Sequence, residues 1–186
     1  MIRDKFLYLN WLGLLLAALA CATPVGAADH VLDPGLLASN WTDDSGKPMT
    51  LSQLRGKSMV ITMGYAACRK TCSTTLLVLK EIQKVLEQQG RAAEFVMVTY
   101  APEADAPRAW AEYRKSRGLD RTNWHFLSGS VQDTRRMASM LDLNFWSYDE
   151  HIMHDFRVVI FDADGKFLRE VGWLDVGHLA EILAHL

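Results

Sequence analysis

Two cysteines placed four residues apart are the side chains of this sequence best suited to chemistry. Cys68 and Cys72 follow an apolar, β-branched run at residues 59–65, which predicts a buried strand. Leucines and valines at helical spacing predict a helix over residues 73–89. Both thiols are therefore expected where a strand turns into a helix, which is where sites are built in open α/β folds.

The surroundings of the two thiols favour reactivity. A helix N-terminus offers unpaired amide N–H groups and a partial positive charge, and Arg69 and Lys70 add two cations, so we expect stabilised thiolates. Residues four apart on a helix face the same way, so the sulfurs can converge on one metal ion or close a disulfide. The alternative is packing, because free cysteine is among the most buried residue types.

Composition limits the class of protein. A chain of 186 residues suits one domain, and 49% hydrophobic with 23% charged residues is typical of a globular protein. The net charge of -2 predicts no nucleic-acid surface. Three cysteines are too few for a disulfide scaffold.

The N-terminus predicts export. Arg3 and Lys5 precede an uncharged run at residues 6–22, followed by small residues, so residues 1–28 are interpreted as a signal peptide or membrane anchor. We expect a periplasmic protein, or one anchored in the membrane and facing the periplasm. Membrane contact is expected only through this segment.

Three fates of the leader remain open. Cleavage after Ala27 or Ala28 would release a soluble protein, retention would leave an anchor that is long enough to span, and Cys21 could carry a lipid. All three place the domain in an oxidising compartment, where a dithiol needs a metal or a reductant to stay reduced.

The remaining chain alternates strand and helix signals. Residues 29–40 show no periodicity and are expected to form an extended arm, and residues 41–186 form the domain. The expected elements are a β-hairpin and a helical turn within 41–54, strands at 94–100 and 124–127, helices at 107–117 and 131–141, a hairpin of 157–161 with 166–171, and a helix at 175–186 with Asp175 as its N-cap. This alternation predicts a layered α/β sheet.

Three stretches carry a family resemblance: LRGKSMVITMGYAACRKTCSTTL, TYAPEADAPRAWAEY and HDFRVVIFDADGK. Together they resemble the Sco/SenC family of copper-binding cytochrome c oxidase assembly proteins, over roughly residues 41–186. That family has a histidine eight residues before the aspartate of the last hairpin, and His154 precedes Asp162 by that interval. The resemblance implies a thioredoxin-like three-layer α/β fold with a central mixed sheet, an N-terminal β-hairpin, and a C-terminal β-hairpin plus helix.

The resemblance also implies a copper site made of Cys68, Cys72 and His154, in which the two cysteines are also the redox pair. Two thiolates and an imidazole favour Cu(I) and can also hold Cu(II), and Zn(II) is the competitor that ligand type alone leaves open. The sequence departs from the family pattern at Arg69 and Ser73, where the family usually has prolines.

Other residues near His154 have alternative interpretations. His151 is a surface residue or an auxiliary ligand, and we favour the surface interpretation. Trp146 and Tyr148 precede His154 in what we expect to be a flexible loop, where they would shield the site or contact a partner.

Two further sets of side chains offer possible ligands. If cleavage follows Ala27, the new terminus places an α-amine and the imidazole of His30 around a Cu(II) or Ni(II) site. Met59 and Met63 share one face of the expected strand, and core packing is favoured over thioether ligation.

Three functions follow from these candidates. The first is an exported copper metallochaperone for an oxidase copper centre, whose partners are an oxidase subunit or another copper chaperone, and a thiol reductant. The second is a thiol-disulfide oxidoreductase that reduces a partner's cysteines. The third is a thiol peroxidase, for which Arg69 and Thr71 lack the expected spacing. Copper holding requires His154, whereas dithiol exchange should survive its loss.

Overall fold

A computed structural model describes residues 31–67, 72–149 and 151–184. The expected signal or anchor at residues 1–28 lies outside the described residues, together with Cys21 and His30, and it stays a prediction. None of the described helices has the length and apolar character that a membrane crossing requires.

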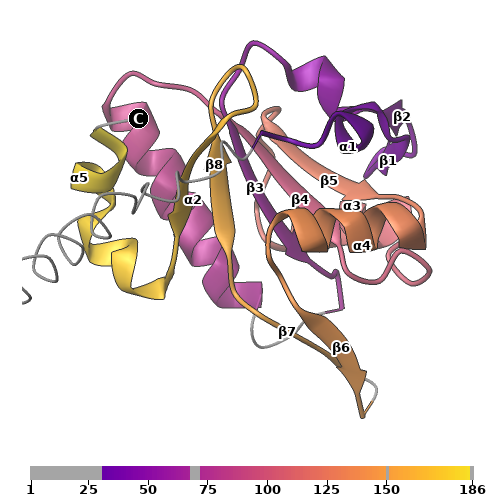
Figure 1. Cartoon of the computed structure of the whole chain (residues 1–186). Helices are drawn as coiled ribbons and strands as arrows, with labels where there is room; N and C mark the ends of the chain where they lie inside the picture. The colour runs from indigo at the N-terminus through magenta and orange to yellow at the C-terminus, as the bar shows by residue number, and fades with distance from the viewer. Residues whose placement is uncertain (1–30, 68–71, 150, 185–186) are drawn as a thin grey trace, which may run out of the picture. The chain divides into compact units, whose positions relative to one another are not determined.

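A seven-stranded mixed sheet forms the centre of the domain, in the order β2-β1-β5-β4-β3-β8-β9 (Figure 1). The inner strands β3, β4 and β5 are parallel, whereas β1 and β8 run antiparallel to their neighbours β5 and β3. The strands are β1 Trp41–Asp43, β2 Pro48–Met49, β3 Met59–Gly64, β4 Glu94–Thr99, β5 Trp124–Ser128, β8 Val158–Phe161 and β9 Phe167–Val171. The predicted N-terminal hairpin, central strand and C-terminal hairpin are confirmed.

Strand β3 is buried along its whole length, because helices cover both faces of the sheet. Val60 packs with the first core cluster, and Met59, Ile61 and Met63 pack with the second, so the predicted core role of the two methionines is confirmed. The one polar side chain of the strand is satisfied, since the hydroxyl of Thr62 donates to the carbonyl of Arg157 at 2.7 Å.

Helices lie on both faces and make the expected three layers. One face packs against α2 Cys72–Gln88, α3 Pro107–Ser116 and α5 Leu179–Ala184. The other packs against α1 Pro34–Ala38, the 3₁₀ turn η1 Leu51–Leu54 and α4 Val131–Met140. The sequence predicted all of these helices except α1. It predicted the last helix to begin at Asp175, before the observed start of α5 at Leu179.

The expectation of an extended arm at residues 29–40 is wrong for its described part, which contains α1. Asp33 caps this helix by accepting from the amides of Gly35 and Leu36, and Pro34 stands at its first position. The helix has five residues, fewer than two turns, so its apolar spacing was too short to recognise.

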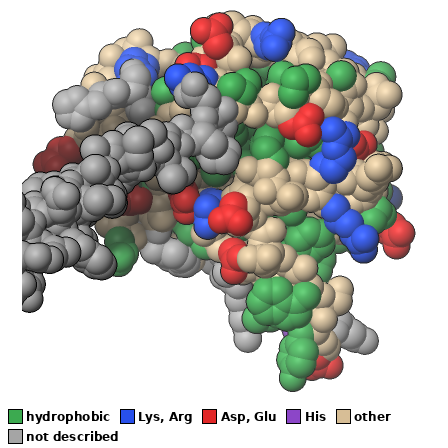
Figure 2. Space-filling view, in the orientation of Figure 1, with side chains coloured by type: hydrophobic (Ala, Val, Ile, Leu, Met, Phe, Trp, Pro, Cys, Tyr) green, Lys and Arg blue, Asp and Glu red, His purple; other side chains and the backbone are tan. Residues whose placement is uncertain are grey.

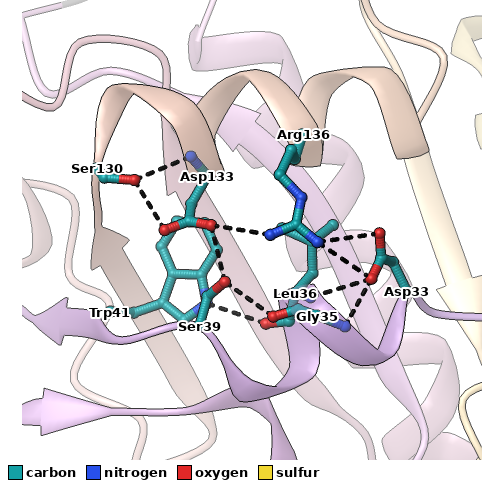
Figure 3. Close-up of polar contacts among 8 residues, drawn as sticks. All are labelled: Asp33, Gly35, Leu36, Ser39, Trp41, Ser130, Asp133 and Arg136. Atoms are coloured by element: carbon teal, nitrogen blue, oxygen red, sulfur yellow. Dashed lines mark hydrogen bonds and ion pairs between the residues drawn. The ribbon is translucent and has the colours of Figure 1, made fainter.

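A polar network fastens α1 to α4 (Figure 3). Arg136 on α4 contacts the carboxylates of both Asp33 and Asp133 at 3.3 Å. Asp133 also accepts from the hydroxyls of Ser39 and Ser130, each at 2.8 Å. The hydrogen bond from Ser130 is the main cause that holds the pKa of Asp133 below its usual range. The arm is therefore tied to the domain by side chains distant in sequence.

A second, two-stranded sheet replaces the flexible loop that we expected before residue 154. Strands β6 Phe145–Tyr148 and β7 His151–His154 form an antiparallel hairpin that projects from the domain (Figure 1). Asp149 follows β6 with a φ of 46°. The sequence has no glycine or asparagine at this turn, so the usual hairpin signal was missing.

The chain end also differs from expectation. Instead of one helix over residues 175–186, a 3₁₀ helix η2 Trp173–His178 precedes α5. Asp175 is not the N-cap. It lies at the third position and reaches back to accept from the amide of Gly172 at 2.7 Å.

The packing of Trp41 in the N-terminal hairpin against Gly129 can be tested by substitution. A Cβ at this position would lie 2.5 Å from Cε3 of the buried Trp41 ring. We expect Gly129→Ala to lower the free energy of unfolding by about 1–3 kcal/mol, because the ring must move. Urea denaturation checks this. The control is Gly177→Ala, whose Cβ meets nothing within 4 Å. Equal stability changes in the two variants would contradict the packing argument.

Candidate functional site

The CxxxC motif spans the connection between the central strand and the longest described helix. Strand β3 ends at Gly64, and α2 begins at Cys72. The predicted strand-to-helix junction is therefore confirmed. Cys68 lies outside the described residues, and of Cys72 only the backbone is described.

His154 lies over the carboxyl ends of the two central strands. Its ring stacks on Tyr100 with centroids 4.7 Å apart, and it meets Tyr65 edge-on at 6.4 Å. Tyr65 directly follows β3 and Tyr100 directly follows β4. Because Tyr65 precedes Cys68 by three residues, the hairpin brings His154 beside the segment that leads into the CxxxC motif.

The hydrogen bonding of His154 defines its tautomer. Its Nδ1 lies 2.8 Å from the carbonyl oxygen of Asp155. A carbonyl can only accept, so Nδ1 carries the proton and the neutral ring keeps its lone pair on Nε2. Metal-binding histidines commonly have this arrangement, in which one nitrogen donates to an oxygen and the other is left for the metal.

The base of the β6–β7 hairpin is clamped by two residues. The carboxylate of Asp155 accepts from the side-chain and backbone N–H groups of Asn144 at 2.9 and 3.1 Å. The amide of Asp155 donates back to the carbonyl of Asn144 at 3.0 Å. The bonds from Asn144 hold the pKa of Asp155 below its usual range. Phe145 and Ile152 pack against the second core cluster, so one face of the hairpin is supported by the domain.

Asp105 is a site residue whose role the sequence did not reveal. Its carboxylate is buried, and it accepts from the hydroxyl of Thr99 at 2.6 Å and from the amide of Ala66 at 3.0 Å. Ala66 precedes Cys68 by two residues, so Asp105 fixes the chain as it enters the CxxxC motif. Burial raises the pKa of Asp105. The only available signal was an acidic residue in the loop at the carboxyl end of a buried strand.

The loop that carries Asp105 is itself held in place. The backbone carbonyl of Asp105 accepts from the hydroxyl of Ser128 at 2.5 Å. The oxygen of Ser128 accepts in turn from the indole N–H of Trp110 at 3.1 Å. This buried chain of hydrogen bonds links the loop to β5 and α3.

The hairpin separates the aromatic residues that we expected to share a role. Register pairs Trp146 with Met153 and Tyr148 with His151, so these four point away from the face that carries His154. Trp146 and Tyr148 therefore do not cover His154. Tyr65 and Tyr100 do, as the ring contacts show.

The three-ligand set stays a prediction. No group of three or more His, Cys, Asp or Glu side chains that could hold a metal occurs among the described residues, which exclude both cysteine side chains of the motif. His151 is exposed on the opposite face of β7 from His154, so the two imidazoles do not converge.

Comparison with known proteins decides the family. The model of the SCO1/SenC family matches residues 39–184. The chain belongs to the SCO1/SenC family. A putative copper-binding protein of Stutzerimonas stutzeri is 24% identical over 171 residues, which cover 82% of each chain.

Solved structures show that this SCO1/SenC chain has the thioredoxin-like fold of Sco proteins. Copper-bound ScoI of Arabidopsis thaliana superposes with a TM-score of 0.70 at 21% identity, covering 79% of this chain and 94% of that one. BsSco, described as having a disulfide switch and as a member of the Sco family of cytochrome c oxidase assembly proteins, superposes with a TM-score of 0.68 at 19% identity, covering 83% and 94%.

Asp105 makes stability depend on pH. Because its pKa in the folded protein is raised above the ordinary 3.8, the folded state holds this proton more tightly than the unfolded state. The contribution of Asp105 is therefore favourable at low pH and is lost as pH rises through the folded pKa. We expect Asp105→Asn to gain stability relative to the wild type between about pH 4 and pH 7, measured by urea denaturation. A difference that stays constant across this range would contradict the assignment.

Proposed function

We propose that this SCO1/SenC chain is an exported copper-binding protein that delivers or prepares copper for the copper centre of a respiratory cytochrome oxidase. The observation that carries the proposal is the position and tautomer of His154. The ring meets Tyr65 edge-on, beside the segment that leads into the CxxxC motif, and its Nδ1 donates to the Asp155 carbonyl, so we infer that Nε2 is the ligand atom.

Each ligand has a distinct role in this proposal. Cys68 and Cys72 supply thiolates, and His154 supplies an imidazole from a separate element. Soft thiolate donors favour Cu(I), and a site with so few ligands can release its cargo by ligand exchange. Copper is the cargo here, and copper-bound relatives of the same fold support it. Tyr100 and the Asn144–Asp155 clamp position His154 without binding the metal.

The partners follow from this role. We infer a copper-receiving oxidase subunit or another copper chaperone, and a reductant that keeps the dithiol reduced outside the cytoplasm. The basic and apolar N-terminal sequence supports export, and family membership supports a role in oxidase assembly.

Reduction of a partner's disulfide is the second candidate, favoured by the placement of Cys72 at the first residue of α2. One thiolate would attack the partner's disulfide and form a mixed disulfide, which the other thiolate would then resolve. Two electrons and two protons would pass to the partner, leaving two thiols there and a Cys68–Cys72 disulfide here. The disulfide switch described for BsSco gives this candidate a precedent of the same fold.

Anaerobic Cu(I) titration against a competing chelator tests the copper site. With Cys21→Ser as the background, we expect one-to-one binding that weakens more than about 100-fold in Cys68→Ser and in His154→Ala, because each removes a direct ligand. His178→Ala is the matched control, since His178 is an exposed histidine on η2. It should bind copper as the background does.

Two outcomes would contradict this assignment. If the background protein binds Cu(I) no more tightly than Cys68→Ser, the copper role fails and the reductase becomes the working hypothesis. If His154→Ala keeps full affinity, His154 is not a ligand.

The reductase activity is measured separately. Reduction of a model disulfide by His154→Ala at the background rate would show that dithiol exchange does not need this histidine.

A further inference from the structure

The outer face of the β6–β7 hairpin carries four exposed side chains that the three-ligand site does not use. Trp146 and Tyr148 are 52% and 69% exposed, and Met153 is 45% exposed. His151 is also exposed. Hydrophobic side chains gather on this projecting element in Figure 2.

Strand register places these four on one surface. Trp146 pairs directly with Met153, and Tyr148 pairs directly with His151. Directly opposite residues have Cβ atoms about 4.5–5.5 Å apart. His151 and Met153 are two residues apart on β7 and so face the same side, about 7 Å apart along the strand. The unbranched methionine side chain is flexible enough to bring its sulfur toward the imidazole.

The chemistry of this surface is that of a soft-metal site. Thioether sulfur selects Cu(I), and imidazole suits copper as well. The indole face opposite Met153 attracts a cation, since tryptophan gives the strongest cation–π interaction of the aromatic residues.

These ligand atoms are already available. Within the described part of the chain, no side-chain hydrogen bond or ion pair engages His151, Met153, Trp146 or Tyr148, which pair with one another only through the backbone of the hairpin. Metal binding would therefore break no side-chain hydrogen bond or ion pair of these four residues. Exposed Asp149 at the turn adds a negative charge next to this surface.

We propose that His151 and Met153 bind Cu(I) on the outer face of the hairpin, with the Trp146 ring against the metal. The inference rests on the proposed copper function and deepens it, because Met153 and His154 are neighbours on opposite faces of β7. A Cu(I) ion on the outer face and the imidazole of His154 lie on opposite sides of the same strand, β7. This outer site is where a partner can give copper to the protein or take copper from it by ligand exchange.

A thiol-free chain isolates this outer site. In Cys21→Ser, Cys68→Ser, Cys72→Ser protein, anaerobic Cu(I) and redox-inert Ag(I) are titrated while tryptophan fluorescence and the methionine methyl NMR signals are followed. We expect one equivalent of metal to bind, with a shift of the Met153 methyl signal. His151→Ala and Met153→Leu should each weaken binding about tenfold or more, since each removes one of two ligands. Trp146→Phe should retain binding and lose the fluorescence change.

Three controls assign the site. His178→Ala and Met49→Leu change a histidine and a methionine elsewhere, and both should bind as the thiol-free parent does. His154→Ala should also retain binding, because its imidazole lies on the other face of β7. Absence of binding, binding unchanged in His151→Ala and Met153→Leu, or loss of binding in His154→Ala would each overturn the proposal. The three-ligand site needs Cys68 and Cys72, so its success or failure is measured separately in the cysteine-containing chain.

Discussion

Burial of β3 on both faces is the constraint on which the rest of the structure depends. Its six residues are all buried, and β4 runs parallel to it in register from Met59 paired with Glu94 to Gly64 paired with Thr99. Since parallel neighbours end at the same edge of a sheet, the residues just beyond them are brought together. Tyr65 and Tyr100 are those residues, and both contact His154. The core therefore fixes the position of these two tyrosines, and the hairpin places His154 against them.

Hydrogen bonds to backbone groups hold the chain on both sides of the candidate site. Asp105 binds the amide of Ala66, and His154 donates to the carbonyl of Asp155. Contacts of this kind fix the path of the chain before Cys68 and around His154. Loss of the buried Asp105 carboxylate would leave the amide of Ala66 and the hydroxyl of Thr99 without this acceptor, which is destabilising. Asp105 thus joins the region before Cys68 to the loop after β4, and through Ser128 to β5.

Sequence reasoning succeeded where a periodic pattern was long and failed where structure came from distant contacts. Strand β3 and helix α2 carry six and seventeen residues of clear pattern, and both were predicted. Helix α1 has five residues, and its stability comes from burial and from Arg136, which is 103 positions from Asp33 in the chain. No local pattern reports such a contact. The β6–β7 hairpin was missed because its turn lacks glycine. Once the strand is known, its alternation places His154 and Met153 on opposite faces. The bond from Ala66 to Asp105 spans 39 positions and depends on the register of β3 with β4.

Strand geometry links the inner and the outer face of the hairpin. Successive residues of a strand point to opposite sides, so His154 on the supported face of β7 has a neighbour, Met153, on the outer face. His154 contacts Tyr100, whereas Met153 is open to solvent. The Asn144–Asp155 hydrogen bonds hold the base of the hairpin and so fix the position of both faces relative to the domain. A contact on Met153 therefore lies one residue away from the imidazole that packs against Tyr65 and Tyr100. A flexible loop could also carry a histidine ligand, but it would lose this fixed relation between the two faces.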